Sequence, residues 1–295
     1  MAAIKLFVDS VANMEDGLAA RLGIATIPYN IVIDGVNRKD GVDVTARDVY
    51  AASLDKTRAL PKTSGIAAGD LIAPFGKVLA AGGQVVYMTI SSYLSASYGN
   101  ALAAVRELQG TGRILVVDTH TISMGMGLMA ERCQADIDAG LDLKAIAADM
   151  EDLKKRLAVE FCIEKLDNLY RGGRCSGLSY FFGKKLHIHP IVGMVEGKLI
   201  PLSKTRGKDI RLGLERLLAD LREDLATDNL DRSFPVYVVD ADAPLWSKAL
   251  ETKARDLLQG LAAVRFCEAS SVVAVHAGPG TVGLGWVRKK APART

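Results

Sequence analysis

The stretch 84–118, QVVYMTISSYLSASYGNALAAVRELQGTGRILVVD, contains two strand patterns separated by a helix pattern. The apolar run Gln84–Ile90 predicts a buried strand, and Ser97–Leu108 predicts an amphipathic helix. Ile114–Asp118 predicts a second buried strand. Strands that alternate with helices in this way indicate a largely parallel sheet with helices on both faces.

The same alternation extends on both sides of this stretch and defines an N-terminal α/β domain, which we predict to span residues 1–158. Further strands are expected at Lys5–Val8 and Ile27–Ile33, the latter ending at the turn Asp34-Gly35. Thr45 is the expected N-cap of a helix. The remaining helices are predicted at 14–22, 70–81, 123–139 and 142–157.

After residue 158 the pattern changes to one with antiparallel character, and we predict a C-terminal α/β domain over residues 159–290. A hairpin is expected about Glu196-Gly197, followed by a long helix over Asp209–Leu225. Shorter elements complete this half: a strand at 161–163, a helix ending at 172–173, a strand at 235–239, a helix at 246–258, and strands at 271–275 and 283–287. A ligand cleft is expected between the two domains.

The composition is that of an ordinary globular protein, with 49% hydrophobic and 24% charged residues among 295. The net charge is only +3, and the basic residues are scattered among 34 acidic ones. This balance argues against nucleic acid as a partner. Four cysteines without paired spacing predict buried free thiols. The N-terminal sequence has no signal-peptide pattern and no segment has membrane-span character, so a cytoplasmic protein without stable membrane insertion is expected.

Small hydroxyl residues gather where the predicted parallel strands end, at Asp9-Ser10, Ser91-Ser92 and Asp118-Thr119. The crevice beyond such strand ends is the usual ligand site of open α/β sheets. Ser92 and Ser95 also precede a helix whose free N–H groups favour an anion. Thr63 and Ser64, in a predicted loop, could add two hydroxyls. Any one of these residues alone is better explained as a helix cap or turn former, but the cluster as a whole suits a carboxylate or a phosphate.

His276 follows an apolar run that predicts a strand and precedes a Gly-Pro-Gly turn, where a histidine can reach into a cleft. A structural role and a ligand-binding role are equally compatible with this position. Gly125–Ala130 matches the loose dinucleotide pattern G-x-G-x-x-A, but it lies too far from the end of the preceding strand, so close helix packing is the better interpretation. No nucleophile-elbow sequence is present, and no acidic or thiol residue has metal-site spacing with the histidines.

Taken together, the chain resembles the DegV family over nearly its whole length. The resemblance rests on the order of these segments: Asp9-Ser10, Pro61-Lys62-Thr63-Ser64, Ile90-Ser91-Ser92-Tyr93-Leu94-Ser95, Gly172-Gly173-Arg174, His189-Pro190-Ile191-Val192, Lys204-Thr205-Arg206-Gly207-Lys208 and His276-Ala277-Gly278-Pro279-Gly280. It implies a two-domain α/β protein that binds a long-chain fatty acid between its domains. It also implies presentation of the acid to a separate fatty acid kinase, without catalysis, metal or cofactor in this chain.

The resemblance further implies where the ligand binds. The carboxylate is expected near Thr63, Ser64, Ser92, Ser95 and the His276–Gly278 turn. Arg206 is a candidate for the kinase-facing or head-group surface. The chain departs from the usual family loop at Gly65-Ile66-Ala67, and again at Ala96-Ser97-Tyr98-Gly99, which changes the neighbouring pocket walls.

Two other classes of function remain compatible with the sequence. The first is a lipid hydrolase with His276 as general base beside Ser92 or Ser95, although an elbow and an acidic orienting residue are missing. The second is a regulatory module that senses lipid and binds a protein other than a kinase.

Overall fold

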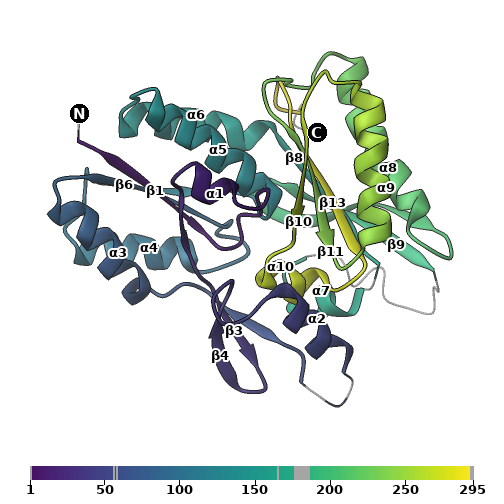
Figure 1. Cartoon of the computed structure of the whole chain (residues 1–295), viewed down its shortest axis with the longest axis horizontal. Helices are drawn as coiled ribbons and strands as arrows, with labels where there is room; N and C mark the ends of the chain where they lie inside the picture. Colours follow the sequence, from purple (N-terminus) through teal and green to yellow (C-terminus); the bar gives the residue numbers. More distant parts are fainter. Residues whose placement is uncertain (1, 56, 58, 165, 176–186, 293–295) are drawn as a thin grey trace.

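The computed structural model describes residues 2–55, 57, 59–164, 166–175 and 187–292, which form three sheets flanked by helices (Figure 1). The first sheet is entirely parallel and has the strand order β2-β1-β6-β7. Its strands are β1 (Ile4–Asp9), β2 (Ala25–Ile27), β6 (Gln84–Thr89) and β7 (Ile114–Asp118). The predicted parallel sheet is therefore confirmed.

The second sheet is mixed and has the order β10-β9-β8-β13-β11-β12. Among the described strands of this sheet, only β11 and β12 pair in parallel, so the predicted antiparallel character is confirmed. The predicted hairpin turn at Glu196-Gly197 is present, with φ of 47° and 81°. The strands are β8 (Leu157–Cys162), β9 (Ile188–Val195), β10 (Lys198–Arg206), β11 (Val236–Ala241), β12 (Val264–Glu268) and β13 (Thr281–Val287).

Helices separate and cover these two sheets in layers (Figure 1). One face of the first sheet carries α3 (Ala68–Ala80) and α4 (Ser97–Glu107), and the other carries α5 (Met124–Asp138) and α6 (Leu143–Arg156). Helix α5 also contacts β8, β11 and β13, so it is shared by both sheets. On the far face of the second sheet lie α8 (Arg211–Ala226) and α9 (Pro244–Leu258).

Glycines on α5 allow this helix to approach both sides closely. A Cβ atom on Gly125 would lie 2.7 Å from Val159 Cγ2 on β8, and one on Gly127 would lie 2.3 Å from the backbone oxygen of Asn13. The G-x-G-x-x-A sequence is thus a helix-packing feature, as predicted.

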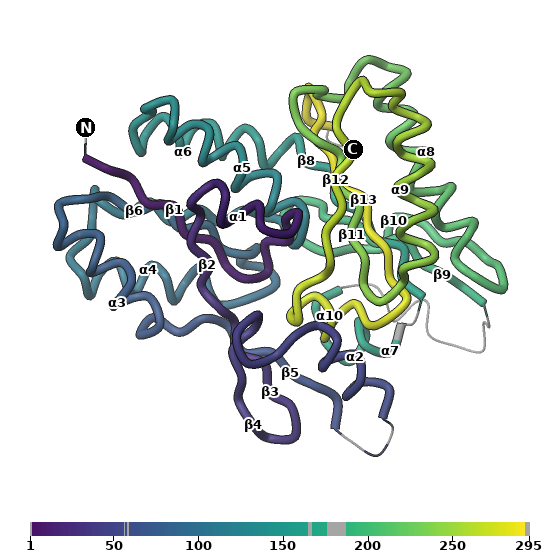
Figure 2. The backbone as a smooth tube through the Cα atoms, viewed as in Figure 1, coloured from purple at the N-terminus to yellow at the C-terminus, as the bar shows by residue number. Residues whose placement is uncertain are grey.

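A third, small sheet of order β4-β3-β5 lies at the end of the first sheet (Figure 2). It contains β3 (Asn30–Ile33), β4 (Val36–Lys39) and β5 (Lys62–Ser64). Nearby are α2 (Ala46–Leu54), α7 (Leu166–Gly172) and α10 (Ser271–Ala277), and α10 contacts both of the other helices. Thr45 caps α2 as predicted, since its side chain accepts from the backbone N–H of Asp48.

Several expected elements differ in the structure. The helix predicted over Met14–Leu22 is only α1 (Leu18–Arg21), because the chain turns at Gly17 with a φ of 69°. The single strand predicted over Ile27–Ile33 is divided between two sheets at Pro28, which lacks the N–H that a continuous ladder needs. Thr63 and Ser64, predicted in a loop, belong to β5, and β4 and β12 were not expected.

The strand predicted over Ser271–Val275 is wrong, because this segment is helix α10. A short apolar run fits either a buried strand or a buried helix, and local capping decides between them. The Ser270 side chain accepts from the N–H of Val273, and Asp40 Oδ1 accepts from the N–H of Ser271 at 3.1 Å. Both contacts satisfy N–H groups of the first helical turn, which have no partner within the helix.

The described residues form two apolar cores, and the larger runs from the first sheet across α5 to α10. The smaller lies between the second sheet and α8 and α9. All four cysteines are buried thiols, as predicted. Within the part of the chain that the structure describes, no helix is both long enough and apolar enough to cross a bilayer. The division at residue 158 stays a prediction.

Candidate functional site

A pocket of about 180 Å³ is lined by residues from both halves of the chain. Most of its wall is apolar, and five polar side chains also line it. The apolar part consists of Ile90, Leu94, Ala96, Ile122, Leu169, Leu199 and Val272. The polar part consists of Tyr29, Thr63, Ser95, Arg174 and His276, and Gly65 completes the lining. An apolar cavity with a few polar groups is the usual form of a small-molecule site.

Helix α10 supplies two of the lining residues because of its helical period. Val272 and His276 are four residues apart, which places them on one face of a helix. In the strand expected from sequence, Val272 and His276 would also share a face, but Ala274 would lie between them on the same side. The helix starts against the N-terminal half of the chain, because Asp40 accepts from Ser271 N–H and from Ser10 Oγ at 2.6 Å.

The His276 imidazole contacts Thr63 directly, with Nε2 lying 3.0 Å from Thr63 Oγ1. Burial, together with the positive charge of Arg174, lowers the pKa of His276 to about 4. The ring is therefore neutral near pH 7. Nδ1 is buried and has no hydrogen-bond partner among the described residues. A bare lone pair is cheaper to bury there than an orphaned N–H, which favours the tautomer with hydrogen on Nε2. In that tautomer Nε2 donates to Thr63, whose own hydroxyl hydrogen is left to point into the pocket.

Ser95 belongs to a cluster of three hydroxyl groups with Tyr29 and Ser97. The Tyr29 hydroxyl donates to Ser95 Oγ at 2.9 Å and lies 2.7 Å from Ser97 Oγ. The two serine oxygens are 3.1 Å apart. Gly65 packs against this cluster, since a Cβ atom there would lie 3.0 Å from Ser95 Oγ. Gly65, which departs from the usual family loop, has no side chain and therefore leaves the serine hydroxyls room to face the pocket.

Arg174 provides the positive charge of the pocket. Its side chain is exposed, and its Nη1 donates to the backbone oxygen of Gly172 at 2.6 Å. Gly172 in turn lies against the imidazole, because a Cβ atom there would be 2.5 Å from His276 Nδ1. A guanidinium beside neutral donors suits an anionic head group.

The β9–β10 hairpin, which belongs to the C-terminal half of the chain, contacts the N-terminal half beside the pocket. Leu199 of β10 lines the pocket, and two residues earlier the Gly197 oxygen accepts from Ser91 Oγ at 2.6 Å. Lys198 Nζ lies 5.0 Å from the centroid of the Tyr93 ring, a cation–π distance. The hairpin tip is therefore attached to the loop that follows β6.

The structure brings together three of the predicted site residues, Thr63, Ser95 and His276, at this pocket. The other four, Ser64, Ser92, Arg206 and Gly278, are not among the described residues that line it. Ser64 is exposed on the other side of β5 from Thr63, and Arg206 is exposed at the end of β10. Ser92 is exposed and its backbone N–H donates to Asp118 Oδ1 at 3.1 Å. Gly278 ends α10 with a φ of 72° and lies against Asn168.

Two polar lining residues, Tyr29 and Arg174, were not among the site residues predicted from the sequence. Tyr29 is on the buried side of the alternating segment 27–33, and a buried tyrosine hydroxyl generally needs a polar partner. Arg174 belongs to Gly172-Gly173-Arg174, one of the segments on which the family resemblance rests. Both signals were present in the sequence, but neither identified the pocket without the fold.

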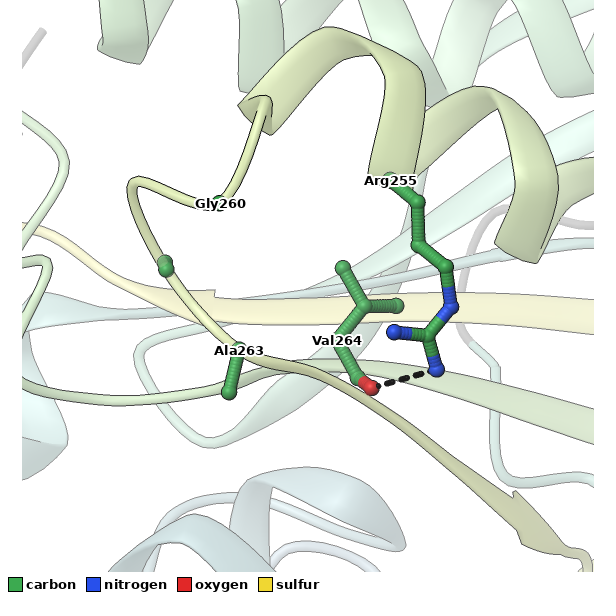
Figure 3. A pocket seen from close by; sticks show the side chains of 5 residues that line it. Arg255, Gly260, Ala263 and Val264 are labelled. Carbon is green, nitrogen blue, oxygen red and sulfur yellow. Dashed lines mark hydrogen bonds between the residues drawn. The ribbon is translucent and has the colours of Figure 1, made fainter.

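A larger hollow of about 380 Å³ lies after α9, where Arg255, Gly260 and Val264 border it (Figure 3). Arg255 is its one charged lining residue among those described, and it donates to the Val264 oxygen at 2.9 Å (Figure 3). It also pairs with Glu251 at 2.8 Å. Because this cation already has partners and few polar groups converge there, the smaller pocket is the better candidate site.

An α/β protein with an apolar pocket that ends in hydroxyl, imidazole and guanidinium groups is suited to an amphiphile with an acidic head group. The chain belongs to the DegV family, because the family model described as "Uncharacterised protein, DegV family" matches residues 3–289. A DegV domain-containing protein from Deinococcus radiodurans is 28% identical over 284 residues, which cover 95% of this chain and 97% of that protein.

Solved structures agree with this assignment. A DegV family protein from Thermus thermophilus, described by its fatty acid binding, is similar with a TM-score of 0.84 and 28% identity. That match covers 97% of this chain and 99% of the other. A protein from Thermotoga maritima, said to reveal fatty acid binding function, has a TM-score of 0.80 and 25% identity, covering 97% of this chain and all of the other. The resemblance found in the sequence is therefore confirmed.

Proposed function

We propose that this chain binds a long-chain fatty acid in the pocket between its two halves and presents the carboxylate to a separate fatty acid kinase, without catalysis of its own. The observation that carries the proposal is the meeting of Thr63, Ser95 and His276, from three distant segments, at one apolar pocket beside Arg174. The fatty acid binding of the two similar proteins supports it.

The chemistry of the pocket separates a tail from a head group. Each methylene removed from water contributes about 0.8 kcal/mol, so the apolar wall can hold an acyl chain tightly. A buried carboxylate is costly unless several donors meet it. The Thr63 and Ser95 hydroxyls and the Arg174 guanidinium are such donors, and the neutral His276 ring directs the Thr63 hydroxyl.

Phosphorylation would be carried out in trans. A carboxylate oxygen attacks the γ-phosphorus of ATP held by the kinase, the bond to the β-γ bridging oxygen breaks, and an acyl phosphate and ADP form. This chain would position the carboxylate and supply no nucleophile of its own. The division into domains 1–158 and 159–290, a cytoplasmic location and a kinase-facing role for Arg206 are parts of the same proposal.

The hydrolase alternative is less well supported by the site. His276 contacts Thr63 rather than Ser92 or Ser95, and its Nδ1 has no carboxylate among the described residues to orient it. A pKa of about 4 also makes the imidazole a weak general base at neutral pH. A lipid-sensing regulatory module would use the same pocket, and its partner protein would distinguish it.

The test starts with the protein as purified. Native mass spectrometry is expected to show one fatty acid per chain, identified after release by denaturation. The loaded protein, mixed with a bacterial fatty acid kinase and ATP, is expected to yield acyl phosphate, and omission of either protein should abolish it. A chain that is empty and does not take up palmitate or oleate would contradict the binding proposal. If the chain binds a fatty acid but no acyl phosphate forms, the binding proposal stands and presentation to the kinase is contradicted. Turnover of acyl esters that His276→Gln abolishes would favour the hydrolase.

A further inference from the structure

The three hydroxyl groups of Tyr29, Ser95 and Ser97 have their hydrogen-bond directions fixed by their surroundings. Each hydroxyl has one hydrogen to donate and two lone pairs to accept with. The Tyr29 hydrogen is donated to Ser95 Oγ. The backbone N–H of Ser97 also donates to Ser95 Oγ, at 3.3 Å. Both lone pairs of Ser95 Oγ are thus occupied, so this hydroxyl can make a further contact only by donating its hydrogen.

The direction of the remaining contacts follows from the same count. Because Tyr29 donates to Ser95, the 2.7 Å contact between Tyr29 and Ser97 must use the Ser97 hydrogen. Ser97 Oγ in turn accepts from the backbone N–H of Ile66 at 3.2 Å. Donation therefore runs from Ile66 to Ser97, from Ser97 to Tyr29 and from Tyr29 to Ser95. Chains of hydrogen bonds with one direction strengthen each other in a protein interior.

We infer that Tyr29 is a positioning residue that turns Ser95 into an obligatory hydrogen-bond donor and so makes the pocket selective for an ionised carboxylate over an alcohol. Tyr29 itself is 2% exposed and Ser97 is fully buried, whereas Ser95 is partly exposed and lines the pocket. Without a ligand, the Ser95 hydrogen closes the triangle by donation to Ser97, 3.1 Å away. A carboxylate oxygen of the ligand competes with Ser97 for the Ser95 hydrogen. An alcohol oxygen can accept that hydrogen too, but the alcohol's own hydrogen needs an acceptor where the surrounding groups are donors. This inference rests on the proposed fatty acid binding.

The experiment compares palmitate with 1-hexadecanol, which has the same chain length and an uncharged head group. Tyr29→Phe keeps the ring and removes the hydroxyl group that donates to Ser95 and accepts from Ser97. Tyr50→Phe is the matched control, because Tyr50 is a buried tyrosine of α2 whose hydroxyl has no hydrogen-bond partner in the described part of the chain. We expect Tyr29→Phe to weaken palmitate binding about tenfold with little change for hexadecanol, the size expected for one hydrogen bond to a charged group. Tyr50→Phe should change neither.

A spectroscopic measurement separates positioning from a merely structural role. The carboxyl carbon of bound [1-¹³C]palmitate, followed by NMR during a pH titration, reports the pKa of the bound acid. Weaker donation from Ser95 to the carboxylate should raise that pKa by about one unit in Tyr29→Phe and leave it unchanged in Tyr50→Phe. Ser97→Ala, one step earlier in the series, should shift it in the same direction.

Each outcome decides the inference. Unchanged palmitate affinity and bound-acid pKa in Tyr29→Phe would overturn it, as would an equal loss for palmitate and hexadecanol. If the wild-type chain binds neither compound, the proposed function itself fails, and this is seen before any variant is compared. Wild-type binding of palmitate with an unaffected Tyr29→Phe variant leaves the proposed function intact and overturns the role of Tyr29 alone.

Discussion

His276 Nε2 lies 3.0 Å from Thr63 Oγ1 although 213 residues separate them in the chain. The contact joins α10 to β5 and orients one hydroxyl at the pocket. Thr63→Val keeps the shape of the side chain and removes this hydroxyl from the pocket. We expect Thr63→Val to weaken fatty acid binding about tenfold, measured by calorimetry with palmitate, because one donor to a charged group is lost.

Thr121→Val provides the control for that substitution. Thr121 is 1% exposed and its Oγ1 has no hydrogen-bond partner among the described residues, so the same change removes a buried hydroxyl from a residue that does not itself line the pocket. Its palmitate affinity should equal that of the wild type. Equal losses in the two variants would mean that Thr63 does not contact the head group.

The buried His276 makes stability depend on pH with a definite sign. Its pKa falls from 6.5 to about 4 on folding, so between these values the unfolded chain binds more protons. The contribution of His276 to the free energy of unfolding is therefore fully present above pH 6.5 and is lost as the pH falls toward 4. The loss is about 3 kcal/mol, at roughly 1.4 kcal/mol per pH unit.

The measurement is the difference in unfolding free energy between the ligand-free wild type and His276→Gln, from urea melts at pH 7 and pH 4. We expect the wild-type advantage to shrink by about 3 kcal/mol at the lower pH. Asp9 has the opposite sign, because burial raises its pKa from 3.8 to about 7 and its contribution is lost as the pH rises through 7. Asp9 is present in both proteins, so it cancels in the difference. A difference independent of pH would show that His276 is not buried as a neutral ring.

The hairpin tip at Gly197 should be sensitive to a single added methyl group. A Cβ atom there would lie 2.8 Å from Tyr93 Cδ2 and 3.1 Å from His120 Cγ, and the φ of 81° is itself unfavourable for alanine. Gly35→Ala is the control, since Gly35 occupies a comparable hairpin turn with a φ of 79° and nothing within 4 Å of its added Cβ. We expect chemical denaturation to show a loss for Gly197→Ala at least about 1 kcal/mol larger than for Gly35→Ala. Equal losses would mean that only backbone conformation matters at the tip.

The approach of α5 to the start of the chain predicts a larger effect at Gly127. An added Cβ would lie 2.3 Å from the backbone oxygen of Asn13, which cannot move without displacing its loop. Gly127→Ala should cost about 3 kcal/mol of unfolding free energy or more. Gly99→Ala on α4 has open space around its Cβ and should stabilise the chain by up to about 1 kcal/mol. A neutral Gly127→Ala would contradict the close packing of α5 with this loop.

Local sequence pattern was sufficient to predict a helix or strand where residues close in the chain determine its conformation. β7 was predicted with its observed bounds, and the helices before and after it were predicted to within a few residues. Thr45 was identified as a cap because its partner is only three residues away. Prediction failed where a distant contact decides the conformation. The run Ser271–Val275 is a helix partly because Asp40, far away in sequence, accepts from its first N–H.

Periodicity and residue type were enough to predict the α/β class, the family and the clustering of hydroxyl residues at strand ends. Tertiary structure alone decided which hydroxyls face the pocket. Ser92 and Ser95 are three residues apart, yet Ser92 points to solvent while Ser95 meets the Tyr29 hydroxyl. The physical reason is that a hydroxyl becomes part of a site through the groups that fix its hydrogen, and here Tyr29 and His276 come from segments that only the folded chain brings together.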